Sequence, residues 1–143
     1  MVHMSLFEWL WEGANPGPIG GVEVGGQDRS DRSRAMVIVS FLIASAGLGG
    51  WVYLVLAVFE VRSAAGLAGI GIATLAYLVL GYFVHPKADM SNVGWAGGLM
   101  DNPFRYSDDL NRLLLTVMIV LLPGRFIAEA MVDMVRLVKN AGK

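Results

Sequence analysis

Two long uncharged runs, residues 36–59 and 64–84, limit most strongly what this chain can fold into. At ~1.5 Å per residue, a helix over the first run would be roughly 36 Å long, enough to cross a hydrocarbon core of ~30 Å. Neither run has the polar face that a helical hairpin in a soluble core would need. A short polar turn at residues 60–63 joins them. The sequence therefore predicts a transmembrane hairpin with helices over residues 35–60 and 63–84.

The composition agrees with a lipid environment. Of the 143 residues, 55% are hydrophobic and 16% are charged, whereas a soluble domain carries about 25% charged residues. A net charge of −1 gives no electrostatic basis for binding nucleic acid. The chain has no cysteine, which excludes disulfides and thiolate metal sites. We therefore expect one small all-α integral membrane domain that contacts the lipid bilayer.

Small residues recur at intervals of four along the second run, with Tyr77 intervening. They are Ala65, Gly69, Ala73 and Gly81. Small side chains let two helix backbones approach closely where lipid provides no hydrophobic drive between helices. This ridge predicts helix packing, either against the first span or against a neighbouring subunit.

Residues 1–34 form a glycine-rich arm with a short aromatic segment. Glycines and prolines in residues 13–28 argue against a regular element there. The aromatic segment suits either the membrane–water interface or the surface of another protein. The arm has no basic region typical of a secretory signal, so the first span is expected to be permanent. The residues assigned to the membrane interface are Trp9, Trp11, Arg29, Arg32 and Arg34.

Residues 85–109 are too aromatic for a solvated linker and too rich in glycine for a helix. We expect a structured loop that contacts a partner, because aromatic and arginine side chains dominate binding hot spots. The residues assigned to partner binding are Trp95, Asp101, Phe104, Arg105 and Tyr106. Ser107 followed by two aspartates then indicates the start of a helix.

Residues 110–143 predict membrane-associated helices broken at Pro123. Beyond the proline, polar residues recur every three or four positions and form one narrow stripe: Arg125, Glu129, Asp133, Arg136 and Asn140. Such a stripe suits a helix lying in the interface, with its carboxylates on the wet face. Alternatively, residues 110–138 form a third span. An intramembrane Glu129 or Asp133 would then indicate proton or ion transfer.

The positive charges favour two spans. If the N-terminus is cytoplasmic and the hairpin alone crosses the membrane, ten of the 11 lysines and arginines lie inside and only Arg62 lies outside. A third span would move Arg136, Lys139 and Lys143 outside as well. We therefore expect a cytoplasmic N-terminus in an inner or plasma membrane, with the third span as the alternative.

Residues with obvious catalytic potential are sparse. The two histidines, His3 and His85, lie outside both runs, and no metal-ligand spacing or nucleophile motif is present. The sequence thus predicts no metal and no cofactor. It predicts a non-catalytic accessory, anchoring or scaffold subunit that binds other membrane subunits or copies of itself. The alternative is an ion- or proton-conducting subunit of a transport or electron-transfer complex that uses Glu129 and Asp133.

Overall fold

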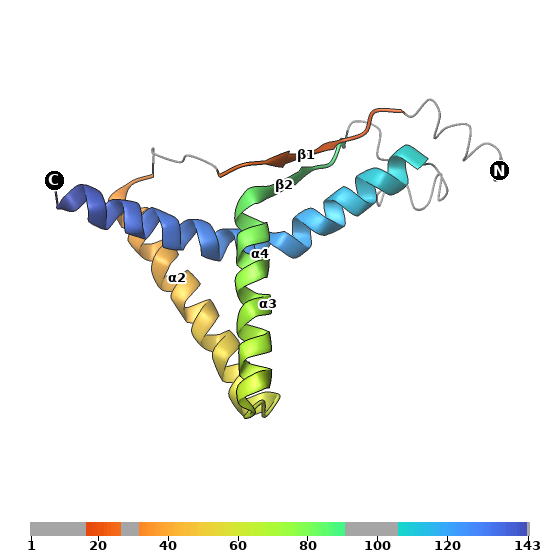
Figure 1. Ribbon diagram of the computed structural model, residues 1–143. Helices are drawn as coiled ribbons and strands as arrows, with labels where there is room; N and C mark the ends of the chain where they lie inside the picture. Colours follow the sequence, from red (N-terminus) through yellow and green to blue (C-terminus); the bar gives the residue numbers. More distant parts are fainter. Residues whose placement is uncertain (1–16, 27–31, 91–105, 143) are drawn as a thin grey trace. The chain divides into compact units, whose positions relative to one another are not determined.

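The computed structural model describes residues 17–26, 32–90 and 106–142. These residues are mostly helical (76%). In chain order the elements are β1 (Gly21–Val24), α2 (Arg34–Tyr53), the π-helical turn η1 (Leu54–Val58), α3 (Ala64–Phe83), β2 (Val84–Lys87) and α4 (Tyr106–Ala141) (Figure 1). Three helical stretches are long and apolar enough to cross a membrane: Arg34–Val58, Ala64–Phe83 and Asp109–Ala141. In these general terms the prediction of a helical membrane protein is confirmed.

The hairpin has the predicted boundaries to within a few residues. Ser33 caps α2, because its hydroxyl accepts the backbone N–H of Met36 at 3.3 Å. At the other end of the first span the helix widens into η1, and Glu60 turns the chain with a positive φ of 51°. Ser63 then accepts the N–H of Gly66 at 3.1 Å and starts α3. Figure 1 shows α2 and α3 close together at this turn and farther apart away from it.

The chain forms two compact units. The first comprises Met1–Val24 and Val84–Val120, and the second comprises Gly25–Phe83 and Leu121–Lys143. Residues 106–120 of α4 therefore belong to the first unit and residues 121–141 to the second.

A two-stranded ribbon in the first unit departs from the sequence prediction. β1 pairs antiparallel with β2, with Gly21 opposite Lys87 and Val24 opposite Val84. Residues 13–28 and 85–109 were expected to lack regular elements, and this is wrong for the four residues of β1 and for the three residues of β2 from His85 to Lys87. The glycines around β1 leave too few consecutive strand-forming residues to indicate a strand, and a proline such as Pro86 is uncommon inside a strand. A two-stranded ribbon tolerates Pro86, because each strand has an edge that needs no N–H donor.

Asn111 of α4 joins this ribbon to the helix in the first unit. Its side chain is fully buried (2% exposed). The amide oxygen accepts the backbone N–H groups of Gly20 at 2.9 Å and Asp89 at 3.1 Å, and the amide nitrogen donates to the carbonyl of Pro18 at 3.1 Å. One side chain thus holds the segment that enters β1 and the segment that leaves β2.

The second unit buries little of its own apolar surface. Only 11% of the most apolar window of the first span and 6% of that of the second is buried inside the chain. Among the described residues of this unit, the buried apolar ones are few and mostly small: Val37, Ala44, Val55 and Ala130. Most large apolar side chains of the hairpin therefore face outward, as expected of helices whose surroundings are lipid or other membrane proteins.

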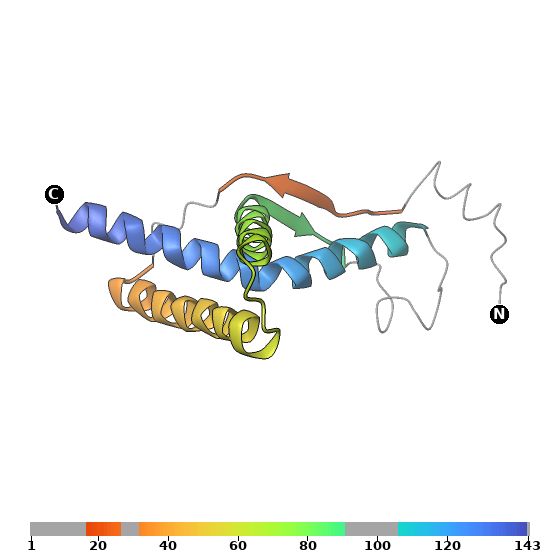
Figure 2. The ribbon, with the colours of Figure 1, turned by 60° about the horizontal axis from the view of Figure 1, so that its bottom comes forward.

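The predicted break at Pro123 is absent, since α4 continues through the proline (Figure 2). A proline removes one N–H donor from a helix but keeps a helical φ. The next donor along the chain, the N–H of Gly124, donates to the Tyr77 hydroxyl of α3 at 3.1 Å. This contact from a neighbouring helix supports the backbone where the proline weakens it. Because the contact comes from α3, it is not visible in the sequence around Pro123, which by itself predicts a break.

Candidate functional site

A cluster of two arginines and two carboxylates lies in the second unit. The guanidinium of Arg32 lies 3.2 Å from the carboxylate of Asp133 and 3.6 Å from that of Glu129. Arg125 donates from Nε to the other oxygen of Glu129 at 2.8 Å. The side chains of Glu129 and Asp133 are only 9% and 11% exposed. We call these four residues the charge cluster.

Helical spacing and a helix start together build the charge cluster. Arg125, Glu129 and Asp133 follow one another at intervals of four on α4, so they share one face. Arg32 precedes the capping residue of α2, and its planar guanidinium reaches both carboxylates at once. The stripe on α4 was predicted from its spacing. Arg32 was assigned to the membrane interface instead, because nothing in the sequence distinguishes it from its neighbours Arg29 and Arg34.

The structure also corrects the environment of the stripe. The carboxylates were expected on a wet face, but Glu129 is buried, with 7% of the residue exposed. The reason is long-range: Arg32, just before α2, pairs with both carboxylates, and periodicity within α4 does not report that contact. Arg136 and Asn140, farther along, are exposed as expected.

The end of α3 touches α4 closely. A Cβ on Gly81 would lie 2.6 Å from the backbone nitrogen of Arg125, so a larger residue does not fit without a shift. Tyr77, one turn earlier, accepts the N–H of Gly124. The charge cluster holds residues 121–141 of α4 to the start of α2, and Gly81 lies against them at the end of α3. These residues therefore close the end of the hairpin opposite its turn.

The small residues of the predicted ridge have different surroundings at different positions along α3. Gly81 lies at a close approach to α4, which is neither the first span nor the neighbouring subunit that the ridge predicted as its partner. Gly69 has no neighbouring atom within 4 Å of the position of an added Cβ, so it makes no close approach inside this chain. Ala65 is exposed, and Ala73 lines a cavity. Packing of the first part of the ridge against another subunit stays a prediction.

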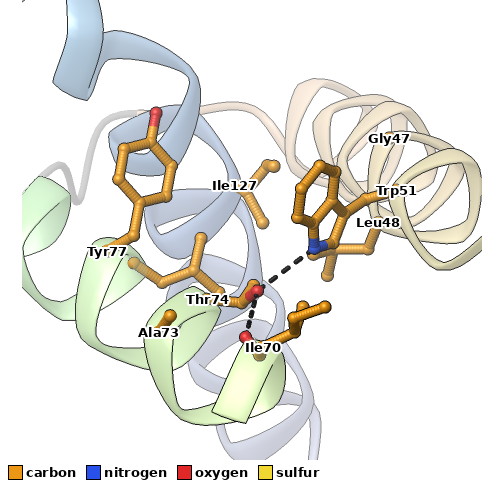
Figure 3. A pocket seen from close by; sticks show the side chains of 9 residues that line it. Gly47, Leu48, Trp51, Ile70, Ala73, Thr74, Tyr77 and Ile127 are labelled. Carbon is orange, nitrogen blue, oxygen red and sulfur yellow. Dashed lines mark hydrogen bonds between the residues drawn. The ribbon is translucent and has the colours of Figure 1, made fainter. Parts of the chain in front are cut away.

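An apolar groove opens between the helices of the second unit (Figure 3). Its volume is about 440 Å³. Trp51 donates its indole N–H to the hydroxyl of Thr74 at 3.1 Å, and Thr74 donates to the carbonyl of Ile70 at 2.8 Å. The wall thus satisfies these polar groups internally. The lining residues are Gly47, Leu48, Trp51, Ile70, Ala73, Thr74, Tyr77, Leu78 and Ile127. Nothing in the sequence indicates this groove, because its lining residues are ordinary apolar and small residues of the helices.

Most residues predicted to bind a partner lie outside the described part of the chain. These are Trp95, Asp101, Phe104 and Arg105, and the same holds for the interface residues Trp9, Trp11 and Arg29. Tyr106 begins α4, but its side chain is not described. Arg34 is exposed at the start of α2, where an interface residue is expected.

His85 is the buried histidine of β2. It is 4% exposed, and its Nε2 has no hydrogen-bond partner among the described residues. Glu23 lies opposite it in the ribbon and forms an exposed ion pair with Lys87 at 2.6 Å. That hydrogen bond and the positive charge of Lys87 lower the pKa of Glu23 below its usual 4.5. Within the described ranges, no three His, Asp or Glu side chains are grouped to hold a metal ion.

Comparison of the chain with protein-family models, with curated proteins and with solved structures finds no match.

Proposed function

We propose that this protein is a non-catalytic accessory or scaffold subunit of a larger membrane assembly. The observation that carries the proposal is the uncovered outer surface of the hairpin, of which the chain itself buries so little. Five glycines on these spans have open space where a Cβ would stand: Gly47, Gly49, Gly50, Gly69 and Gly71. Glycines in such positions let a second helix approach closely. A partner subunit, or another copy of the chain, fits these surfaces.

We further propose that only the hairpin crosses the membrane and that residues 121–141 lie at its cytoplasmic surface. Their contacts with the start of α2 and the end of α3 support this arrangement, because both helix ends belong to the same end of the hairpin. A cytoplasmic location of this end also agrees with the excess of arginine and lysine there. The alternative, a third span, is supported by the length and hydropathy of Asp109–Ala141.

The charge cluster bears on the alternative function. A buried carboxylate in a membrane protein is a candidate for proton or ion transfer, and Glu129 is such a carboxylate. Here, however, two guanidinium groups contact Glu129 and one of them also contacts Asp133. Two positive and two negative charges balance within the cluster. This pairing favours a role in fastening α4 to α2 over a role in conduction.

A comparison of two pairs of variants tests the function. Under the scaffold proposal, Phe104→Ala and Arg105→Ala release the protein from its assembly while it stays inserted in the membrane. The conduction alternative predicts intact assembly in these variants and lost flux in Glu129→Gln and Asp133→Asn. Co-purification and a proton or ion flux assay in proteoliposomes are measured on all four. Retained assembly in the first pair with abolished flux in the second would overturn the proposal.

Single cysteines test the topology, and the chain offers a clean background because it contains none. Arg62→Cys marks the turn and Asn140→Cys marks the end of α4. The two-span proposal expects an impermeant thiol reagent to label the turn from outside in intact cells, and the end of α4 only after lysis. Labelling of both from outside would establish the third span instead.

A further inference from the structure

The groove between α2, α3 and α4 has the properties of a binding site for a hydrocarbon chain. Its volume of about 440 Å³ falls within the range of roughly 300–1,000 Å³ that is usual for ligand clefts. Apolar cavities exclude water and take up apolar molecules. The hydrogen bonds from Trp51 to Thr74 and from Thr74 to Ile70 leave these wall groups already paired. The groove therefore suits a guest that needs no hydrogen bonds.

The apolar surface is also elongated. A second cavity of about 470 Å³ shares five lining residues with the first and continues toward the turn, to Val55 and Leu67. Along α3 the two cavities together extend from Leu67 to Leu78, about 16 Å at ~1.5 Å per residue. A long, narrow apolar surface favours an extended chain over a compact ring system.

The charges of the second unit differ between the two ends of the hairpin. At the end closed by α4, five described cations accompany two carboxylates, so the balance is positive: Arg32, Arg34, Arg125, Arg136 and Lys139 against Glu129 and Asp133. Arg34 and Lys139 are exposed. At the turn, Glu60 and Arg62 balance each other. Basic residues at a membrane surface attract anionic headgroups, so a lipid whose chain occupies the groove finds complementary charge at the α4 end.

We propose that the groove binds an acyl chain of an anionic phospholipid, with the headgroup at the basic end of the hairpin. The inference requires the hairpin to lie in a bilayer, but it is independent of whether the protein is a scaffold. Trp51 forms part of the wall (Figure 3), so its fluorescence reports the occupant directly.

The experiment uses the full chain with the other three tryptophans, Trp9, Trp11 and Trp95, changed to phenylalanine. The protein is reconstituted in phosphatidylcholine with dibrominated acyl chains, which quench a tryptophan that they touch. Unbrominated phosphatidylglycerol, which is anionic, is then added in steps, and unbrominated phosphatidylcholine serves as the reference. We expect strong quenching of Trp51 at the start. As phosphatidylglycerol is added, the Trp51 fluorescence should recover to an extent that corresponds to a roughly two- to fivefold preference for phosphatidylglycerol over phosphatidylcholine.

A matched pair of glycine variants tests the groove itself. Gly47 lines it and Gly49 does not, and both have open space at the Cβ position. Gly47→Leu fills the groove, so it should reduce the quenching of Trp51 and abolish the lipid preference. Gly49→Leu should behave as the parent does. If Gly47→Leu loses helical structure, Ala73→Leu takes its place, because Ala73 lines the opposite wall.

A second matched pair tests the headgroup. Arg34→Gln removes an exposed charge at the basic end and should lower the preference for phosphatidylglycerol without changing the initial quenching. Arg62→Gln removes the charge at the turn and should change neither. If the parent protein has equal affinity for both lipids, the groove holds ordinary boundary lipid without selectivity, and the proposal is overturned. Absence of quenching in brominated lipid would show that another helix covers the groove, which also overturns it.

Discussion

The guanidinium of Arg32 and the carboxylate of Asp133 lie 3.2 Å apart although 101 positions separate them in the chain. Arg32 also lies 3.6 Å from Glu129, one turn earlier on α4. One side chain before α2 therefore fastens the last helix to the start of the first span. The pairs are largely shielded from water, so removing one partner leaves the opposite charge poorly solvated and is costly.

Replacing Arg32 with glutamine should destabilise the second unit. The change removes the guanidinium that pairs with Asp133, whereas Glu129 keeps its contact with Arg125. We therefore expect a loss of about 1–3 kcal/mol in the free energy of unfolding in detergent micelles. The matched control is Arg34→Gln, which removes an exposed charge two residues away and should change stability by about 0.5 kcal/mol or less. Equal stability of the two variants would show that the charge cluster does not fasten α4.

Tyr77→Phe should weaken α4 next to its proline. The variant loses the hydroxyl that accepts the N–H of Gly124, and a hydrogen bond of this kind contributes about 1 kcal/mol. Hydrogen exchange at Gly124 should become faster, whereas exchange in the middle of α2 should not. Tyr53→Phe serves as the control, because Tyr53 is 66% exposed. Unchanged exchange at Gly124 would show that the Tyr77 hydroxyl does not support the helix at its proline.

Gly81→Ala and Gly69→Ala should separate contacts within the chain from contacts between chains. A Cβ at Gly81 meets the backbone of Gly124 and Arg125, and overpacking of this kind costs about 1–3 kcal/mol. A Cβ at Gly69 meets nothing in this chain. Thermal unfolding of the isolated protein should therefore respond to Gly81→Ala alone. The larger change Gly69→Leu should affect only co-purification with a partner, and no effect there would place Gly69 against lipid.

The hairpin was predictable because its signals are local. Two uncharged runs of spanning length and a polar turn depend on neighbouring residues, and the structure places the helix ends within a few positions of the prediction. The face shared by Arg125, Glu129 and Asp133 was predictable for the same reason, since helical spacing determines it.

The features that sequence analysis missed depend on distant residues. Arg32 does not differ locally from the arginines beside it, and only the fold brings it to Glu129. The ribbon was missed because neither strand is long enough to show alternation, and each forms only by pairing with the other. The continuity of α4 depends on Tyr77, which lies 47 positions before Gly124. In each case the partner that determines the structure is not a neighbour in the sequence.

The pairing of Glu23 with Lys87 predicts how pH affects the ribbon. The pKa of Glu23 is lowered in the folded protein, so its ionised form stabilises the β1–β2 pairing above the unfolded value of 4.5. That contribution is lost as the pH falls through the lower, folded pKa. Because the pair is exposed, the effect on stability should be small. NMR titration should show a pKa for Glu23 below 4.5, and Lys87→Gln should raise it. An unchanged value in the variant would exclude Lys87 as the cause.

Asn111→Ala should release the ribbon from α4. The substitution removes three hydrogen bonds from a site that is 2% exposed and leaves two backbone N–H groups and one carbonyl without their partner. Unsatisfied buried groups are costly, so we expect a loss of about 2–3 kcal/mol in the first unit. Hydrogen exchange should accelerate at Gly20 and Asp89, the two donors to Asn111, and remain unchanged in α3. Asn140→Ala provides the matched control, because Asn140 is exposed on the same helix. Asn111→Asp keeps the acceptor and loses the donor to Pro18, so protection at Gly20 and Asp89 should survive in it better than in Asn111→Ala. Equal exchange in both variants would mean that the volume of the side chain, and not its hydrogen bonds, holds the ribbon to the helix.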